Sequence, residues 1–246
     1  MQNNEIAFLI LSFDKFKVTW KPCIDHLFNA WPDCPYQVFL LNNFIPSEDK
    51  RVIDLLVGED INWSDTLRKG LLKIKSKRIF FLYDDTFITN IDVNEVESIF
   101  KIAIENDMDS IALRKRIFDR GIHFNKKVYK INPTAKYRNS LYQNLIKKDV
   151  LLSLLKPGEN AWEFEKVGNI RNKKLDFFSV YKQKLITEHH GIIKGKWMPE
   201  VHAYLKNEGY SLNEDMFKHH SKSRVLWIKM YTQVFYAVHK FTHLFK

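Results

Sequence analysis

The chain has 246 residues, with 39 Lys and Arg against 29 Asp and Glu, and its formal net charge is +10. This length suits one globular core with at most a small appendage. A hydrophobic share of 45% excludes a disordered chain, and eight Gly and seven Pro exclude a collagen-like one. The positive charge leaves three kinds of partner open, namely nucleic acid, an anionic membrane leaflet and an anionic substrate.

Compartment and crosslinking follow from the first residues and the cysteines. Cys23 and Cys34 are the two cysteines of the sequence, so a disulfide scaffold is excluded and a reduced, cytoplasmic compartment is favoured. The apolar run at 6–11 is too short for a signal peptide or a membrane span. We therefore expect a protein that is made and kept inside the cell.

Strand and helix patterns alternate over the first 115 residues. Residues 6–12 form a continuous apolar run that is typical of a strand buried on both faces. Further strands are predicted at 36–41, 79–83 and 110–113, and helices at 20–30, 63–75 and 93–104. This alternation predicts an α/β fold with a mostly parallel sheet flanked by helices.

The second half is less regular and more basic. Residues 114–148 contain eleven Lys and Arg against Asp119 alone. A helix is predicted at 148–155, a turn at 157–160, and an extended segment at 161–165.

The sharpest local feature is the pair Asp84 and Asp85, which directly follows the third predicted strand. Ligands of open α/β sheets bind beyond the carboxyl ends of the strands, and two adjacent carboxylates there repel each other unless a cation or hydroxyl groups receive them. A divalent cation on a substrate diphosphate takes one or two protein carboxylates. The alternative is a solvated turn in which Asp85 caps a following helix.

Three segments in this order resemble bacterial glycosyltransferases with the GT-A fold: Leu-Ser-Phe-Asp at 11–14, Trp-Pro-Asp-Cys-Pro at 31–35 and Phe-Leu-Tyr-Asp-Asp at 81–85. The resemblance implies a Rossmann-type GT-A-like domain in which an Asp-x-Asp motif holds a divalent metal, Mn²⁺ or Mg²⁺, and the nucleotide-sugar diphosphate. The sequence has Tyr-Asp-Asp in that place, so Asp85 matches the last aspartate of the motif and Asp84 assists it.

A second similarity lies in residues 188–197, Glu-His-His-Gly-Ile-Ile-Lys-Gly-Lys-Trp. It is similar to the His-x-x-Gly-x-x-Lys-Pro-Trp motif of glycogenin-like and lipopolysaccharide galactosyltransferases, with a shorter His-to-Gly interval and Lys196 in place of the proline. The resemblance implies that His190 completes the metal shell and that Lys194 and Lys196 meet the diphosphate. The alternative is a solvated loop.

Two glutamates, Glu163 and Glu165, are candidates for the base that deprotonates an acceptor hydroxyl. In an extended segment they point the same way, with Trp162 and Phe164 on the opposite side. An ordinary half-buried strand shows the same pattern. A Trp-x-x-Glu element of related bacterial enzymes places its glutamate on Glu165, which is therefore the first choice and Glu163 the second.

The segment beyond the first strand supplies two further candidates, Ser12 and Asp14. The GT-A resemblance implies that they contact the base or ribose of the donor nucleotide. Asp14 could equally cap the following helix.

The acid-free C-terminal segment 216–246 reads as a basic amphipathic helix. Its predicted apolar face comprises residues 227, 231, 234, 238, 241 and 245. Such a helix suits an anionic leaflet, with docking on the sheet or on a dimer partner as the alternative. We expect residues 1–215 to form the GT-A-like domain and 216–246 to be this helix.

Together these features predict a metal-assisted glycosyltransferase that moves a sugar from a nucleotide-diphosphate donor to a hydroxyl of a cell-surface glycan or glycolipid, of the lipopolysaccharide or capsule type. We expect it to work at the inner face of the cell membrane, as a cytoplasmic, peripheral protein. The alternative is a basic peripheral membrane or nucleic-acid-binding protein without catalysis. Against nucleic acid, no helix-turn-helix, RNP or zinc-finger pattern is present in the sequence.

Overall fold

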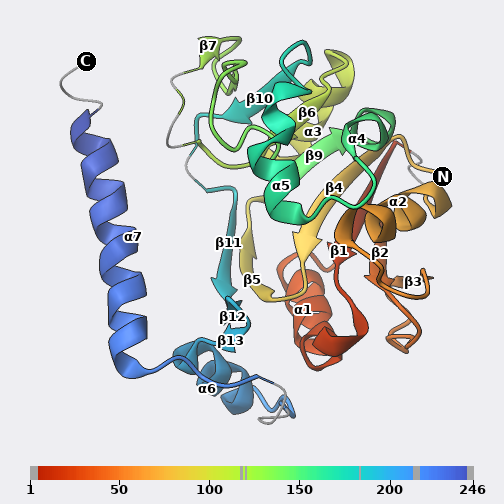
Figure 1. Cartoon of the computed structure of the whole chain (residues 1–246), viewed down its shortest axis with the longest axis vertical. Coiled ribbons are helices and arrows are strands. Elements are labelled where there is room, and N and C mark those ends of the chain that lie inside the picture. Colours follow the sequence, from red (N-terminus) through yellow and green to blue (C-terminus); the bar gives the residue numbers. More distant parts are fainter. Residues whose placement is uncertain (1–4, 117–118, 120, 183, 213–216, 243–246) are drawn as a thin grey trace. The chain divides into compact units, whose positions relative to one another are not determined.

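The computed structural model describes residues 5–116, 119, 121–182, 184–212 and 217–242. The chain divides into two compact units, Met1–Glu188 and His189–Lys246 (Figure 1). The predicted helix at 216–246 belongs to the second unit, and the predicted boundary at 215/216 falls outside the described residues.

A nine-stranded sheet forms the centre of the first unit, in the order β3-β2-β1-β4-β9-β6-β10-β8-β7. The pairs β3-β2, β2-β1, β1-β4 and β6-β10 are parallel, whereas β9 lies antiparallel between β4 and β6. Its strands are β1 (Ile6–Leu11), β2 (Gln37–Asn42), β3 (Ile53–Leu56), β4 (Arg78–Tyr83), β6 (Ser110–Ala112), β7 (Ile122–His123), β8 (Val128–Lys130), β9 (Asn144–Lys147) and β10 (Phe177–Val180). The predicted, mostly parallel sheet is thereby confirmed.

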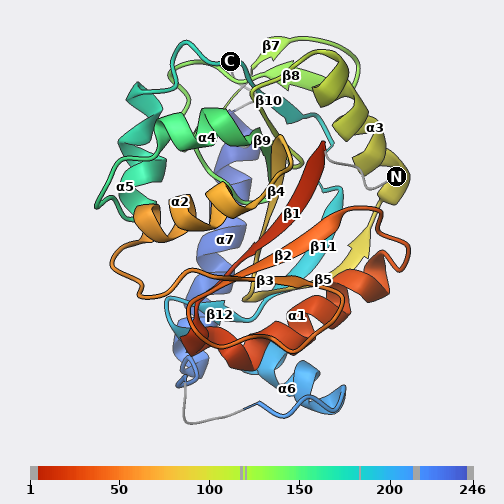
Figure 2. The same ribbon diagram turned by 90° about the vertical axis from the view of Figure 1, so that its right-hand side faces the viewer.

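Helices cover both faces of this sheet. They are η1 (Asp14–Phe16), α1 (Lys17–Ala30), α2 (Trp63–Lys73), α3 (Val93–Glu105), α4 (Lys148–Leu154), α5 (Ala161–Lys166) and η2 (Gly168–Ile170). Figure 2 shows α2, α4 and α5 on one side of the sheet and α1 and α3 on the other. Outside the main sheet, β5 (Thr86–Ile91) pairs with β11 (Ile186–His190).

The alternation of side chains along each strand builds a separate core on each face. On β1, Leu9 belongs to the apolar cluster that includes Leu71 of α2 and Leu151 of α4. The preceding residue, Phe8, packs on the opposite face of the sheet. Its ring centroid lies 4.9 Å from that of Phe80 and 6.2 Å from that of Phe100 of α3. Because both faces are apolar, the strand reads in sequence as an uninterrupted hydrophobic run.

Side-chain caps fix where the two amphipathic helices begin. The Asn62 side chain accepts a hydrogen bond from the backbone N–H of Asp65 at the start of α2, and Asp92 does the same for Glu95 at the start of α3. Each cap satisfies a backbone donor that has no partner within the helix. The helices predicted at 63–75 and 93–104 are therefore confirmed, with ends that differ by one or two residues.

One predicted element is wrong. Residues 161–165 were expected to be extended, but they form the helix α5. Asn160 and Glu163 make a capping box, in which each side chain accepts a hydrogen bond from the backbone N–H of the other residue. This pair of bonds starts a helix, and the apparent alternation of aromatic and acidic residues does not report the backbone conformation.

The second unit contains the hairpin of β12 (Ile192–Ile193) and β13 (Lys196–Trp197), followed by α6 (Pro199–Asn207) and α7 (Lys222–Thr242). Trp197 is fully buried, and its ring lies 5.2 Å from that of His202 on α6. The backbone N–H of Trp197 donates to the carbonyl of Lys218, at 3.0 Å. The segment between α6 and α7 is thus tied back to the hairpin.

The helix α7 occupies most of the predicted C-terminal helix, and several of its large apolar side chains are exposed. They are Leu226, Trp227, Met230, Tyr231 and Val234. Residues 238 and 241 of the predicted apolar face lie where the structure describes no side chains, and residue 245 lies outside the described residues. Among the described residues, no helix is long and apolar enough to cross a membrane.

Candidate active site

The topology brings the carboxyl ends of three strands to one edge of the sheet. β1 and β4 are parallel, with Leu11 beside Tyr83. β4 and β6 are each antiparallel to β9, so they run parallel to one another. The residues that follow these strands, Ser12, Asp84 and Arg114, therefore emerge at the same edge, where open α/β sheets bind their ligands.

Asp84 is held by a short chain of hydrogen bonds from the elements around it. The Ser12 hydroxyl donates to Oδ2 of Asp84, and Nε1 of Trp20 donates to Ser12 Oγ at 2.5 Å. Only 6% of Asp84 is exposed. Burial and the neighbouring Asp85 charge raise the pKa of Asp84 well above its ordinary value. Ser12 therefore holds the Asp84 carboxylate. Its predicted contact with the donor nucleotide stays a prediction.

Asp85 lies in a two-residue turn between β4 and β5. The next element is a strand, so the interpretation of Asp85 as the cap of a following helix is wrong. The Thr86 hydroxyl donates to the carbonyl of Tyr83 at 2.8 Å and closes this turn. Burial raises the pKa of Asp85 to about 6. The turn thus holds two adjacent carboxylates in a poorly solvated place.

A third carboxylate, Glu188, lies within electrostatic range of Asp85 and was not among the predicted site residues. It lies on β11, and burial raises its pKa to about 8. The charge of Arg114 lowers this pKa, while the charge of Asp85 raises it further. In the sequence, Glu188 directly precedes the paired histidines of the tail motif, and that position was the available signal.

Asp14 acts on the backbone of the loop after β2. Its carboxylate accepts hydrogen bonds from the backbone N–H groups of Asn43 and Phe44, at 2.9 and 3.0 Å. The backbone N–H of Asp14 donates in return to Oδ1 of Asn43, at 3.1 Å. The N-cap of α1 is Phe16, with no side-chain hydrogen bond, so Asp14 is not the cap of that helix. Asp14 thereby joins the segments that follow β1 and β2.

The two candidate bases differ in their surroundings. Glu163 is exposed, and its carboxylate accepts the backbone N–H of Asn160 in the capping box, at 2.9 Å. Glu165 is half-buried. The pKa of Tyr83, the residue before Asp84, is raised chiefly by the burial of Tyr83 and further by the charge of Glu165. Two residues apart on a helix, the side chains point in nearly opposite directions. The charge of Glu165 therefore acts on the residue next to the aspartate turn, whereas the carboxylate of Glu163 stabilises the start of α5.

In the second unit, Lys194 and Gly195 form the two-residue turn of the β12–β13 hairpin. Their φ angles are +50° and +70°, the left-handed conformation that such a turn requires. Lys194, Lys196 and His190 are exposed. The Gly-x-x-Lys spacing of the tail motif therefore corresponds to one strand of a tight hairpin and the start of its turn.

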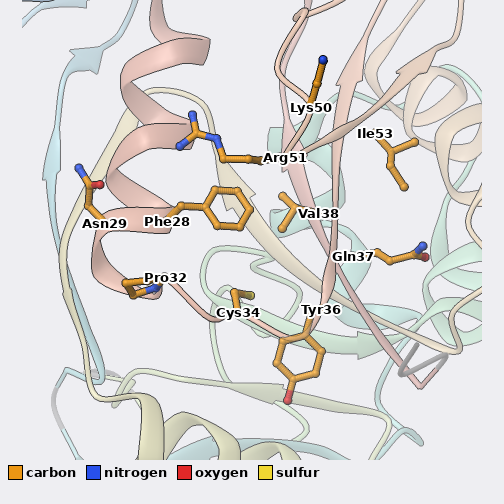
Figure 3. A pocket seen from close by; sticks show the side chains of 10 residues that line it. All are labelled: Phe28, Asn29, Pro32, Cys34, Tyr36, Gln37, Val38, Lys50, Arg51 and Ile53. Carbon is orange, nitrogen blue, oxygen red and sulfur yellow. The ribbon is translucent and has the colours of Figure 1, made fainter. Parts of the chain in front are cut away.

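A hollow of about 490 Å³ lies elsewhere on the first unit, along α1, β2 and β3 (Figure 3). The side chains that line it include Phe28, Cys34 and Arg51. Arg51 is bound to Asp49 and Asp25 in two ion pairs. Of the residues that the structure describes, those lining this hollow include none of the predicted site residues, and we assign it no part in the site.

The carboxylate oxygens at the aspartate turn are suitable ligands for a hard divalent cation. Asp84 and Asp85 offer oxygen ligands, and their crowding in a buried place is relieved by a positive charge. Within the described ranges, no three His, Cys, Asp or Glu side chains are grouped as a complete metal site. A cation that arrives with a diphosphate needs only one or two protein carboxylates, because phosphate oxygens and water complete its shell.

No protein-family model matches the chain, and a search of curated proteins gives no significant match. Among solved structures, S. aureus TarS 1–349 has a TM-score of 0.51 at 10% identity, over 74% of this chain and 59% of that one. Its complex with UDP-GlcNAc also gives 0.51, at 9% identity. A UDP-glucose pyrophosphorylase complexed with UDP-glucose has a TM-score of 0.55 at 10% identity, over 82% of this chain and 99% of that one.

These similarities establish a GT-A-like α/β fold, as the sequence predicted. The chain spans 59% of the length of the TarS structure that it matches. At identities near 10%, what is shared is the arrangement of helices and strands. Any chemistry must be argued from the aspartate turn and the residues around it.

Proposed function

We propose that this protein is a glycosyltransferase that transfers a sugar from a nucleotide-diphosphate donor to a hydroxyl of a cell-surface glycan or glycolipid, of the lipopolysaccharide or capsule type. The observation that carries the proposal is the Asp84–Asp85 turn at the carboxyl edge of a GT-A-like sheet, in which Asp84 is buried and Asp85 half-buried. A site that crowds carboxylates without enough solvent favours a ligand that arrives with positive charge. A diphosphate carrying a divalent cation is such a ligand.

Asp85 and Asp84 would hold the cation, Mn²⁺ or Mg²⁺, with His190 as a further ligand. When bound, the cation supplies charge neutralisation for the leaving diphosphate. Ser12 and Trp20 fix the orientation of the Asp84 carboxylate. Lys194 and Lys196 would contact the diphosphate, as cations that offset its negative charge.

The nucleotide would lie over the segments that follow β1 and β2. Asp14 joins these two segments through the backbone of Asn43 and Phe44. In this proposal Asp14 shapes the surface that receives the nucleotide, and Ser12, bound to Asp84, contacts the nucleotide next to the aspartate turn.

An inverting reaction needs a base for the acceptor hydroxyl, and we assign this role to Glu165. Its charge acts on Tyr83, directly before the aspartate turn. Glu163 is the second candidate, and its carboxylate is already engaged in the capping box. A retaining reaction would need no such base, so substitution of Glu165 also bears on the stereochemical course.

The acceptor is proposed to be lipid-linked and reached at the inner surface of the membrane. The exposed apolar residues of α7 and the Lys and Arg residues of its first turns support this proposal. Arg224 lies 4.3 Å from the centroid of the Trp227 ring, so a cation and an aromatic side chain are presented together. Flotation with vesicles that contain anionic lipid, compared with neutral vesicles, tests this part.

The decisive experiment is a screen of UDP-, GDP-, ADP- and CDP-sugars with and without Mn²⁺, read by thermal shift and by release of the nucleoside diphosphate. We expect one donor to stabilise the chain and to be hydrolysed slowly, in a metal-dependent way. Asp85→Asn should abolish both effects, while the exposed Asp33→Asn serves as the matched control. Formation of a nucleoside triphosphate and a sugar 1-phosphate when pyrophosphate is added, without release of the nucleoside diphosphate, would contradict the proposal, and so would the lack of a response to any donor.

A further inference from the structure

Arg114 is a cation at the carboxyl edge of the sheet, and it was not among the predicted site residues. It follows β6 and Leu113, whose backbone N–H donates to the carbonyl of Gln143 at 2.9 Å. The hydroxyl of Ser179 on β10 donates to the Arg114 carbonyl, at 2.7 Å. The backbone at Arg114 is therefore fixed by neighbours on both sides of its strand.

The Arg114 side chain is held against an aromatic pair. Its guanidinium carbon lies 4.5 Å from the centroid of the Tyr142 ring. The Tyr142 ring lies 6.0 Å from that of Tyr83, the residue before the aspartate turn. A guanidinium stacked on a ring keeps its N–H donors in its own plane, where they can meet two oxygens of one phosphate.

Strand pairing sets the position of Arg114 relative to the aspartate turn. β4 and β6 are both antiparallel to β9, with Ile79 of β4 and Ser110 of β6 each opposite Ile146. A guanidinium on the same sheet edge as Asp84 and Asp85 is well placed for the other end of a ligand whose cation they hold.

We propose that Arg114 binds the diphosphate of the donor and stabilises the negative charge that develops on it as the sugar leaves. The inference rests on the proposed function and names a binding residue of the same site. A planar, always charged guanidinium suits a phosphate better than an ammonium does, because it donates two parallel hydrogen bonds. Before the donor binds, the same charge balances the neighbouring carboxylates.

The test compares Arg114→Gln with Lys115→Gln, which removes the same charge from the next, exposed residue. Dissociation constants are measured by calorimetry with Mn²⁺ for UDP, UMP and uridine, or for the corresponding series of whichever nucleoside diphosphate binds the wild type best. We expect Arg114→Gln to weaken diphosphate binding on the order of ten-fold or more, with little change for the nucleoside. Arg114→Lys should restore part of the loss.

A double variant separates phosphate binding from simple charge balance. If Arg114 only neutralised Glu188, then Arg114→Gln combined with Glu188→Gln would bind the diphosphate as well as Glu188→Gln alone. We expect instead that the double variant binds the diphosphate on the order of ten-fold or more weakly than Glu188→Gln alone, which is the same loss that Arg114→Gln causes in the wild type. Circular dichroism and thermal unfolding show that each variant is folded.

Two failures are distinguishable. Equal affinity of Arg114→Gln and Lys115→Gln for the diphosphate, in a wild type that binds it, would overturn the role of Arg114 and leave the proposed function standing. A wild type that binds none of UDP, GDP, ADP and CDP would overturn the proposed function, and this inference with it.

Discussion

The two ends of β4 show opposite ways of placing charge at a sheet edge. At its amino end, Arg78 is buried, donates to the carbonyl of Met108 and pairs with Asp107 at 3.0 Å. Asp107 also pairs with Lys147 of β9, at 2.9 Å. At the carboxyl end, Asp84 and Asp85 lie next to each other in a turn, with Asp84 buried and Asp85 half-buried.

The carboxyl pKa values follow this contrast. The bond and charge of Lys147, followed by the charge of Arg78, lower the pKa of Asp107. Burial raises the pKa of Asp85 to about 6. One end of the strand therefore uses charge to stabilise the fold, whereas the other holds adjacent, poorly solvated carboxylates that a cationic ligand can satisfy. This imbalance marks a site more clearly than the presence of acidic residues does.

The largest effect is expected from Asp85→Ala. It removes the carboxylate that we propose as the first metal ligand and leaves a small residue in the half-buried turn. Donor hydrolysis and transfer should therefore fall roughly a thousand-fold, as for the loss of a metal contribution of several kcal/mol. Steady-state rates with the donor found in the screen measure this. Near-normal turnover in a folded Asp85→Ala protein would remove the metal assignment at this end of the strand.

Glu165→Gln and Glu163→Gln should separate catalysis from structure on one short helix. Loss of the base in Glu165→Gln should lower kcat about a hundred-fold or more with little change in stability. Glu163→Gln keeps a side-chain acceptor for the capping box, so both its activity and its unfolding free energy should stay near those of the wild type. The reverse ranking of the two variants in kcat would contradict the choice of Glu165.

The balanced end is tested by Arg78→Met. This change keeps much of the side-chain volume but leaves the Met108 carbonyl and Asp107 without their guanidinium partner. We expect a loss of about 2–3 kcal/mol in the free energy of unfolding, measured by urea denaturation. The nucleotide affinity of the folded protein should be unchanged, because the site lies at the other end of the strand. Weakened binding without lost stability would invert the comparison.

The smallest effect concerns the stability of the protein without divalent cations. The pKa of Asp85 is raised on folding, so its ionised form destabilises the folded state above about pH 6. Asp85→Asn should therefore be more stable than the wild type by about 1–3 kcal/mol near pH 7.5. The difference should shrink as the pH falls from 6 towards 4 and vanish below about pH 3, where Asp85 is protonated in both the folded and the unfolded state of the wild type.

Urea unfolding at several pH values measures this difference, and the exposed Asp33→Asn is the control. The control should stay within about 0.5 kcal/mol of the wild type at every pH. A stabilisation of Asp85→Asn that did not depend on pH would mean that burial of the charge is not its cause.

Regular, apolar elements were well predicted from the sequence, because burial on both faces leaves an unmistakable run of large hydrophobic residues. β1 and β4 are such strands, and the period of α2 and α3 gave their positions. Short or mixed strands escaped prediction. β9, Asn144–Lys147, lies within the basic segment, and its place between β4 and β6 comes from pairing with partners far away in the chain.

The site was only partly predictable for the same reason. The aspartate turn directly follows an apolar strand, so Asp84 and Asp85 could be identified from the sequence. Arg114 and Glu188 reach the same place from β6 and β11, and nothing local distinguishes them from other charged residues. The capping box of Asn160 and Glu163 was visible as a pattern, but the alternation of aromatic and acidic residues competed with it and led to the wrong conformation.

The sequence by itself determined the α/β class, the parallel core and the aspartate turn, because these depend on local hydrophobic periodicity and on which residues end a strand. Only the tertiary structure decided which charges are buried, which are paired and which remain crowded. Burial and pairing depend on contacts between segments that are distant in the chain. A carboxylate can therefore stabilise the fold at one end of β4, as Asp107 does, and be available to bind a cation at the other end, as we propose for Asp85.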